Sequence, residues 1–226
     1  MNDLFARLVR ATVGGTAVFL GILFIPAGTI NYWQAWAFAG ALLVSSLLVT
    51  VYMALNDRAL LESRLRMGPA AETTPTQKMI TTVGFAVFVA AIVVMVLDHR
   101  FGWSPSVPAS LSLLGDAIAI AGIVVYFFVV RENRYAASTI AVVEGQTVVS
   151  TGPYAIVRHP MYSGAILVFL GMPLALGSWW GLLFTPLFIS WFAWRLLDEE
   201  RFLGENLRGY EEYKRKVGAR LVPIIW

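Results

Sequence analysis

The chain is organised around the stretch Gly152-Pro153-Tyr154-Ala155-Ile156-Val157-Arg158-His159-Pro160-Met161-Tyr162, which lies directly before an apolar segment. Proline presets φ and has no N–H group, so Pro160 is predicted to be the first residue of a helix, with His159 in the cap region. That helix would direct its free N–H groups and the positive end of its dipole toward Arg158, His159 and Tyr162. The stretch therefore predicts an anion site at a membrane surface.

The composition is that of an integral membrane protein. Of the 226 residues, 58% are hydrophobic and only 14% are charged, whereas soluble domains carry about 25% charged residues. The net charge of +3 does not indicate nucleic-acid binding, because the basic residues lie in short segments that flank apolar spans. Cysteine is absent, and the two histidines, His99 and His159, lie on opposite sides of the membrane in the topology below. We therefore predict no metal site.

The hydrophobic pattern predicts an all-α fold, a polytopic membrane helical bundle of about six spans with a cytosolic C-terminal helical tail. Residues 1–226 form a single membrane domain, in which 11–130 hold four N-terminal spans and 131–226 form a cofactor-binding catalytic region. Mixed leucines and charges after residue 56 suit a helix on the membrane surface. The predicted spans cover residues 11–30, 34–55, 79–97 and 111–130, and then the helical hairpin 160–197, composed of 160–176 and 181–197.

The distribution of basic residues predicts the orientation of the chain. Six spans place the N-terminus, the segments 56–78 and 131–159 and the C-terminal tail on one side. Counted along the sequence, that side holds all of the 17 Lys and Arg residues except Arg100. Because basic residues concentrate on the cytoplasmic side, both termini are predicted to be cytoplasmic, in the inner membrane if the source is bacterial.

Charged residues are absent from the middle of every predicted span, and Asp116 comes closest to one. This weighs against an ion-coupled transporter, which needs buried charges along its path. Charges gather instead at the end of the last span, where Arg195 lies one turn before Asp198 and Glu199 and shares a helix face with them. Glu199 and Glu200 then form either an interfacial ion network or a carboxylate pair that faces a cationic ligand.

The spacing of these residues resembles the isoprenylcysteine carboxyl methyltransferase family, within a wider group of integral-membrane methyltransferases that includes phospholipid N-methyltransferases. The pattern is Gly-x-Tyr-x-x-x-Arg-His-Pro-x-Tyr, then a hydrophobic hairpin, then Glu-Glu-x-x-Leu and Tyr-x-x-Tyr. The segment 131–135 also resembles that family, and the likeness covers about the last hundred residues. The matching residues are Gly152, Tyr154, Arg158, His159, Pro160, Tyr162, Glu199, Glu200, Leu203, Tyr210 and Tyr213.

The resemblance implies an enzyme that takes S-adenosylmethionine from the cytosol and a lipophilic or prenylated acceptor from the membrane lipids. The donor carboxylate would suit the helix start at Pro160, and its ammonium or ribose would suit Glu199 or Glu200. Tyrosine faces would suit the sulfonium or adenine, and Gly152 would permit close approach of the adenine. The residues expected to bind the cofactor are Gly152, Tyr154, His159, Pro160, Tyr162 and Glu200, and those expected to be catalytic are Arg158, Arg195 and Glu199.

Several acceptors are compatible with the sequence: an isoprenylcysteine carboxylate, a phospholipid amine, a quinone-like phenol or a small thiol. A carboxylate needs only a cation such as Arg195 or Arg158, whereas an amine or thiol needs a base, for which Glu199 or Glu200 is suited. The oligomeric state is equally open. Two other functions also fit the pattern, an NADPH-dependent membrane reductase resembling the steroid 5α-reductases, and a non-catalytic lipid carrier or scaffold.

Overall fold

The structure is a computed structural model that describes residues 2–223 and 226, and no β-strand occurs in that part of the chain. The predicted all-α fold is confirmed. Short 3₁₀ turns at 69–71, 152–155 and 180–184 interrupt the connections. The helices are α1 (Asn2–Ala27), α2 (Trp33–Asn56), α3 (Arg58–Leu65), α4 (Pro75–Phe101), α5 (Ala109–Glu132), α6 (Pro160–Ala175), α7 (Thr185–Asn206) and α8 (Tyr210–Lys216).

Five helical segments are long and apolar enough to cross a membrane, and α6, with 16 residues, is shorter. At 1.5 Å per residue α6 is about 24 Å long, slightly less than the hydrocarbon core of a bilayer. The helix of the first span begins earlier than predicted, at Asn2 rather than near residue 11. In these first turns Arg7 pairs with Asp3, one turn away, at 3.1 Å.

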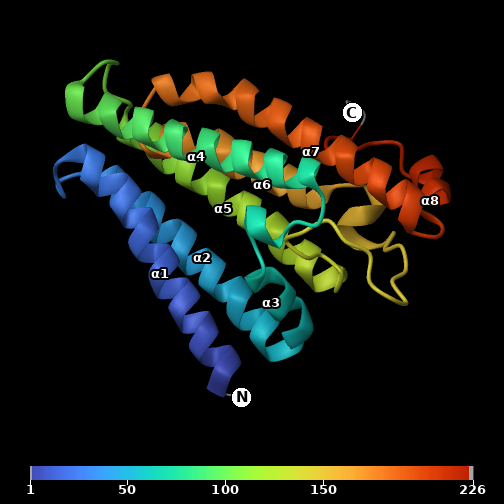
Figure 1. Cartoon of the computed structure of the whole chain (residues 1–226). Helices are drawn as coiled ribbons and strands as arrows, with labels where there is room; N and C mark the ends of the chain where they lie inside the picture. Colours follow the sequence, from blue (N-terminus) through green and yellow to red (C-terminus); the bar gives the residue numbers. More distant parts are fainter. Residues whose placement is uncertain (1, 224–225) are drawn as a thin grey trace.

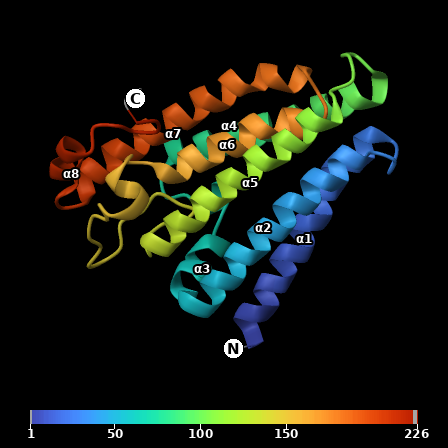
Figure 2. The same cartoon turned by 180° about the vertical axis from the view of Figure 1, so that it is seen from behind.

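The helices run lengthwise, and the molecule has two different ends (Figures 1 and 2). The short connections α1–α2, α4–α5 and α6–α7 gather at one end, while the N-terminus, α3, the 133–159 segment and α8 gather at the other. Arg100 is the one Lys or Arg at the first end, where its Nη1 donates to the Pro26 carbonyl at 2.9 Å. The segments predicted to share one side of the membrane therefore do lie together.

Glycines bring α5 and α6 into close contact. A β-carbon at Gly122 of α5 would lie 2.4 Å from the Gly164 carbonyl oxygen of α6, and one at Gly171 would lie 2.4 Å from the Gly115 carbonyl. Close backbone approach through small residues is a common way to pack membrane helices. Because α6 begins at the central motif, this contact holds the motif against the end of α5.

The surface helix α3 anchors the polar segment that follows α5. Asp57 caps α3 by accepting a hydrogen bond from the Leu60 N–H at 3.0 Å. Arg64 Nη1 then donates to the carbonyls of Ala136 and Ala137, at 3.1 and 2.9 Å. The predicted helix after residue 56 is confirmed, and it fixes the position of a segment about seventy residues further along the chain.

Candidate active site

The start of α6 is built as the sequence predicts. Pro160 is its first helical residue, and His159 is the N-cap with an extended φ of −126°. The preceding 3₁₀ turn begins at Gly152, whose φ of +56° favours glycine. A β-carbon at Gly152 would meet the Glu132 side chain at 2.9 Å. Gly152 thus permits the turn to pack against the end of α5.

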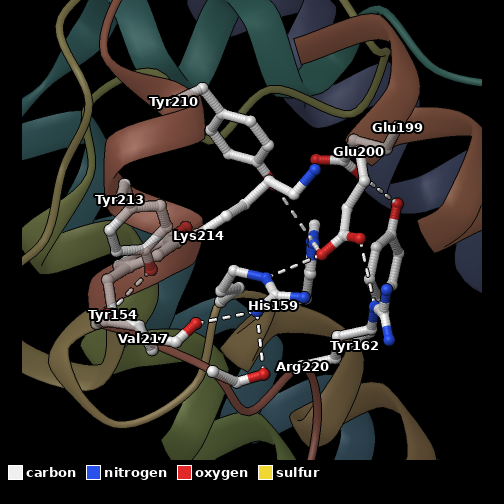
Figure 3. A network of polar contacts seen from close by, with 12 residues as sticks. Tyr154, His159, Tyr162, Glu199, Glu200, Tyr210, Tyr213, Lys214, Val217 and Arg220 are labelled. Carbon is white, nitrogen blue, oxygen red and sulfur yellow. Dashed lines mark hydrogen bonds and ion pairs between the residues drawn. The ribbon is translucent and has the colours of Figure 1, made fainter. Parts of the chain in front are cut away.

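A buried ion network joins this helix start to the end of α7 (Figure 3). Arg158 Nε lies 2.7 Å from Glu200 Oε1, and His159 Nε2 lies 3.3 Å from the same oxygen. Arg220 Nε reaches Glu200 Oε2 at 3.0 Å. Arg158, His159 and Glu200 are all nearly inaccessible to solvent. Glu200 is therefore held by two arginines and a histidine of the protein itself. The sequence predicted either an ion network or a carboxylate pair facing a cationic ligand, and Glu200 lies in an ion network.

The C-terminal segment 217–221 covers the N-terminus of α6. The Arg158 and His159 N–H groups donate to the carbonyls of Ala219 and Arg220, each at 3.0 Å, and the Arg158 guanidinium binds two further carbonyls of this segment. The Tyr162 N–H turns back to the His159 carbonyl at 3.1 Å. Carbonyls of the C-terminal segment thus accept from the N–H groups just before α6, and the Tyr162 N–H of its first turn is bonded within the motif. The predicted anion site at the start of α6 stays a prediction.

Glu199 points toward α6 rather than into the buried network. Its Oε2 accepts a hydrogen bond from the Tyr162 hydroxyl (Figure 3). The carboxylate is half-buried and lines a cavity. The neighbours Glu199 and Glu200 therefore differ in environment, because successive residues of a helix lie about 100° apart around its axis.

Three tyrosines form a cluster beside the network, in which Tyr210 and Tyr213 are buried and Tyr154 is half-buried. The Tyr213 hydroxyl donates to the Tyr154 carbonyl at 2.7 Å, and Asn133 Nδ2 donates to the Tyr154 hydroxyl at 2.9 Å. Burial raises the pKa of Tyr154 to about 12, partly opposed by the Asn133 hydrogen bond. Burial likewise raises the pKa of Tyr210, helped by Glu200, and that of Tyr213, helped by Tyr154. All three remain neutral phenols at physiological pH.

Arg195 pairs with a residue that the sequence did not single out. Its Nη2 lies 2.6 Å from Glu72 Oε1, and its Nη1 donates to Thr81 Oγ1 at 2.9 Å. Asp198 and Glu199 share its helix face, but the ion partner comes from the connection between α3 and α4. Glu72 is the only acidic residue between 63 and 97. Its position as an isolated acidic residue in a basic loop was the one feature of the sequence that could have indicated a role for Glu72.

The predicted residues converge on a cavity of about 340 Å³ at the basic end of the bundle. Its volume lies in the usual range for small-molecule sites. Gly152, Pro160 and Glu200 lie behind its wall rather than in it. Six of the nine predicted site residues line the cavity, namely Tyr154, Arg158, His159, Tyr162, Arg195 and Glu199.

Other walls of the cavity come from outside the motif. The polar segment contributes residues 135–141 and 146–149, and α7 contributes Trp191. Glu72 and Thr81 close the end beside Trp191, whose Nε1 donates to the Ile80 carbonyl of α4 at 2.8 Å. Tyr210 and Tyr213 line the cavity beside α8. The cavity thus joins the tail to the contact between α4 and α7.

The segment that contains most of this site matches a known family. Residues 111–208 match the phospholipid methyltransferase family. The protein is also 38% identical over 82 residues to Protein-S-isoprenylcysteine O-methyltransferase of Schizosaccharomyces pombe. That alignment covers 33% of this chain and 34% of the relative. The predicted resemblance to integral-membrane methyltransferases is confirmed for this part of the chain, and Glu72, Thr81, Tyr210 and Tyr213 lie outside the family match.

Proposed function

We propose that this protein is an integral-membrane methyltransferase that uses S-adenosylmethionine and acts on a lipophilic acceptor at the cytosolic face. The observation that carries the proposal is the cavity, most of whose lining residues belong to the phospholipid methyltransferase match. Side chains of the motif, Tyr154, His159 and Tyr162, meet Glu199 of α7 there. The basic end of the bundle supports the cytosolic orientation, because basic residues concentrate on that side of a membrane.

The residues of the cavity suit a zwitterionic sulfonium nucleotide. Phenol faces attract a sulfonium cation, and the three tyrosines of the cluster stay uncharged. Glu199, with one hydrogen-bond partner from Tyr162, has acceptor capacity left for an ammonium or a ribose hydroxyl. When bound, the donor supplies an electrophilic methyl group. The protein's own contribution is positioning and exclusion of water.

The buried network supports the site from behind. Glu200 holds Arg158, His159 and Arg220 together, so the start of α6, the end of α7 and the C-terminal segment form one wall. A wall that does not rearrange keeps donor and acceptor in line, which is the main requirement for direct methyl transfer. In this proposal Arg158, Gly152 and Pro160 position the wall, and Glu200 orients the His159 ring.

Ligand binding to detergent-purified protein tests the proposal. S-Adenosylmethionine and S-adenosylhomocysteine should raise the melting temperature with increasing concentration, as mass action requires, and NADPH should not. Glu199→Gln should weaken that shift, while Glu205→Gln, on the exposed end of the same helix, should leave it unchanged. A shift with NADPH alone would indicate a reductase, and no shift with any of the three would indicate a carrier or scaffold.

A further inference from the structure

One oxygen of Glu72 has no partner. Arg195 and Thr81 both bind Oε1, at 2.6 and 3.1 Å, but Oε2 is buried and makes no hydrogen bond within the described residues. The Glu72 side chain is only 2% exposed. A buried acceptor without a partner is costly, and most such groups are satisfied by protein, water or a ligand.

The position of Glu72 indicates what could satisfy this oxygen. Glu72 lines the candidate active-site cavity at the end formed by Thr81, Trp191 and Arg195. Trp191 and Arg195 precede Glu199 on α7, toward the interior of the bundle, and Trp191 contacts α4. This end is therefore nearer the membrane than the tyrosine cluster beside α8, and it is the end that a lipophilic acceptor reaches first.

Resting on the proposed function, we propose that Glu72 Oε2 accepts a hydrogen bond from the methyl acceptor and then takes its proton. The acceptor therefore carries an N–H, O–H or S–H group rather than a carboxylate. Two acidic side chains line the cavity. The Tyr162 hydroxyl already donates to Glu199, whereas Glu72 presents an oxygen with both lone pairs unused.

Charge supports the same class of acceptor. The Arg195 guanidinium pairs with Glu72 at 2.6 Å. Of the other arginines that line the cavity, Arg158 pairs with Glu200, and Arg64 donates to the carbonyls of Ala136 and Ala137. A carboxylate brought beside a buried carboxylate would add a like charge in a poorly solvated site. An amine, phenol, alcohol or thiol instead satisfies Oε2 without adding charge.

The transfer balances with the groups named. The acceptor heteroatom forms a bond to the methyl carbon as the methyl–sulfur bond breaks, and the electron pair of that bond stays on sulfur. The sulfonium becomes a neutral thioether, and the acceptor proton moves to Glu72 Oε2. One positive charge, on sulfur, and one negative charge, on Glu72, disappear together, so the step leaves the net charge of the site unchanged.

A panel of four acceptors that share one farnesyl chain tests the proposal on the wild-type protein. The probes are a farnesyl amine, a farnesyl thiol, a farnesylated phenol and N-acetylfarnesylcysteine, which presents a carboxylate. Methylation of at least one of the first three, with none of the fourth, is expected. A preference for the carboxylate probe, or methylation of no probe by protein that binds the donor, overturns the proposal.

Glu72→Gln provides the second measurement, with Glu62→Gln on α3 as the matched control because Glu62 lies outside the cavity. Glu72→Gln should retain donor binding and lower kcat for the protic acceptor about 10²–10⁴-fold. It should also remove the acidic limb of the kcat profile against pH, and Glu72→Asp should restore part of both.

The outcomes separate this proposal from the proposed function. Failure of wild-type protein to bind S-adenosylmethionine overturns the methyltransferase itself. If wild-type protein binds the donor and folded Glu72→Gln does not, Glu72 serves the donor and the acceptor role is wrong. An unchanged kcat in Glu72→Gln also overturns the proposal that Glu72 takes the acceptor proton. If that variant does not fold, the acceptor panel on the wild type decides.

Discussion

Arg158 at the start of α6 and Glu200 near the end of α7 form a buried ion pair with 2.7 Å between Nε and Oε1, although 42 residues separate them. The pair closes the helical hairpin at its motif end. Glu200 also holds His159 and Arg220, so one carboxylate joins three segments of the chain.

Loss of this carboxylate should destabilise the fold. Glu200→Ala leaves the buried Arg158 guanidinium without its carboxylate, and breaking a buried pair in this way costs about 3–5 kcal/mol. Thermal unfolding in detergent checks this, with Glu205→Ala as the control, since the pair of Glu205 with Arg201 is exposed and such pairs contribute about 0.2–1 kcal/mol. Equal melting temperatures for the two variants would contradict the structural role.

Glu199→Gln should abolish most turnover while the protein stays folded. Glutamine retains a carbonyl oxygen that accepts the Tyr162 hydrogen bond, but it lacks the negative charge facing the cavity. Loss of a positioned carboxylate lowers turnover by about 10²–10⁴-fold. Melting temperature and methyl transfer are measured on the same preparation. A variant with normal turnover would remove Glu199 from the site.

Arg195→Ala should abolish turnover, and the structure adds a cost in stability. The substitution leaves the Glu72 carboxylate buried without its cation, which is strongly destabilising. The double variant Arg195→Met with Glu72→Gln removes both charges and should recover most of the lost melting temperature without recovering turnover. Recovery of turnover in the double variant would show that the pair is purely structural.

The glycine contact between α5 and α6 predicts a large effect of one methyl group. Gly122→Ala places a β-carbon 2.4 Å from a backbone oxygen of α6, and overpacking of this kind costs about 1–3 kcal/mol. Gly14→Ala on α1 meets nothing within 4 Å and gains helix propensity. Melting temperature should therefore fall in the first variant and hold or rise in the second.

The tyrosine cluster predicts a loss of stability at alkaline pH. The pKa of Tyr154 is raised to about 12 by burial, whereas an unfolded tyrosine ionises near pH 10. The stabilising contribution is complete below pH 10 and is lost as pH rises from there toward 12. The melting temperature of Tyr154→Phe should fall less steeply over that interval than that of the wild type. Equal slopes of melting temperature against pH for the two proteins would contradict the raised pKa of Tyr154.

Some features of this protein followed directly from the sequence. The long apolar segments specify membrane helices because every backbone polar group in a bilayer must be satisfied within its own helix. Pro160 determines where α6 begins, since its ring presets φ and it has no N–H to lose. The ordered spacing from Gly152 to Tyr213 predicted the resemblance to integral-membrane methyltransferases, which the match of residues 111–208 confirms for that part of the chain.

Only the tertiary structure decided which charges meet. Nothing in the spacing distinguishes Glu199 from Glu200, yet Glu199 faces the cavity and Glu200 is bound by Arg158, His159 and Arg220. Arg195 pairs with Glu72, 123 residues away in the sequence, and the carbonyls of Ala219 and Arg220 accept hydrogen bonds from the N–H groups just before α6. These pairings depend on which helix faces pack together and exclude water. The sequence pattern shows which residues share one face of a helix, but it does not show which other helix packs against that face.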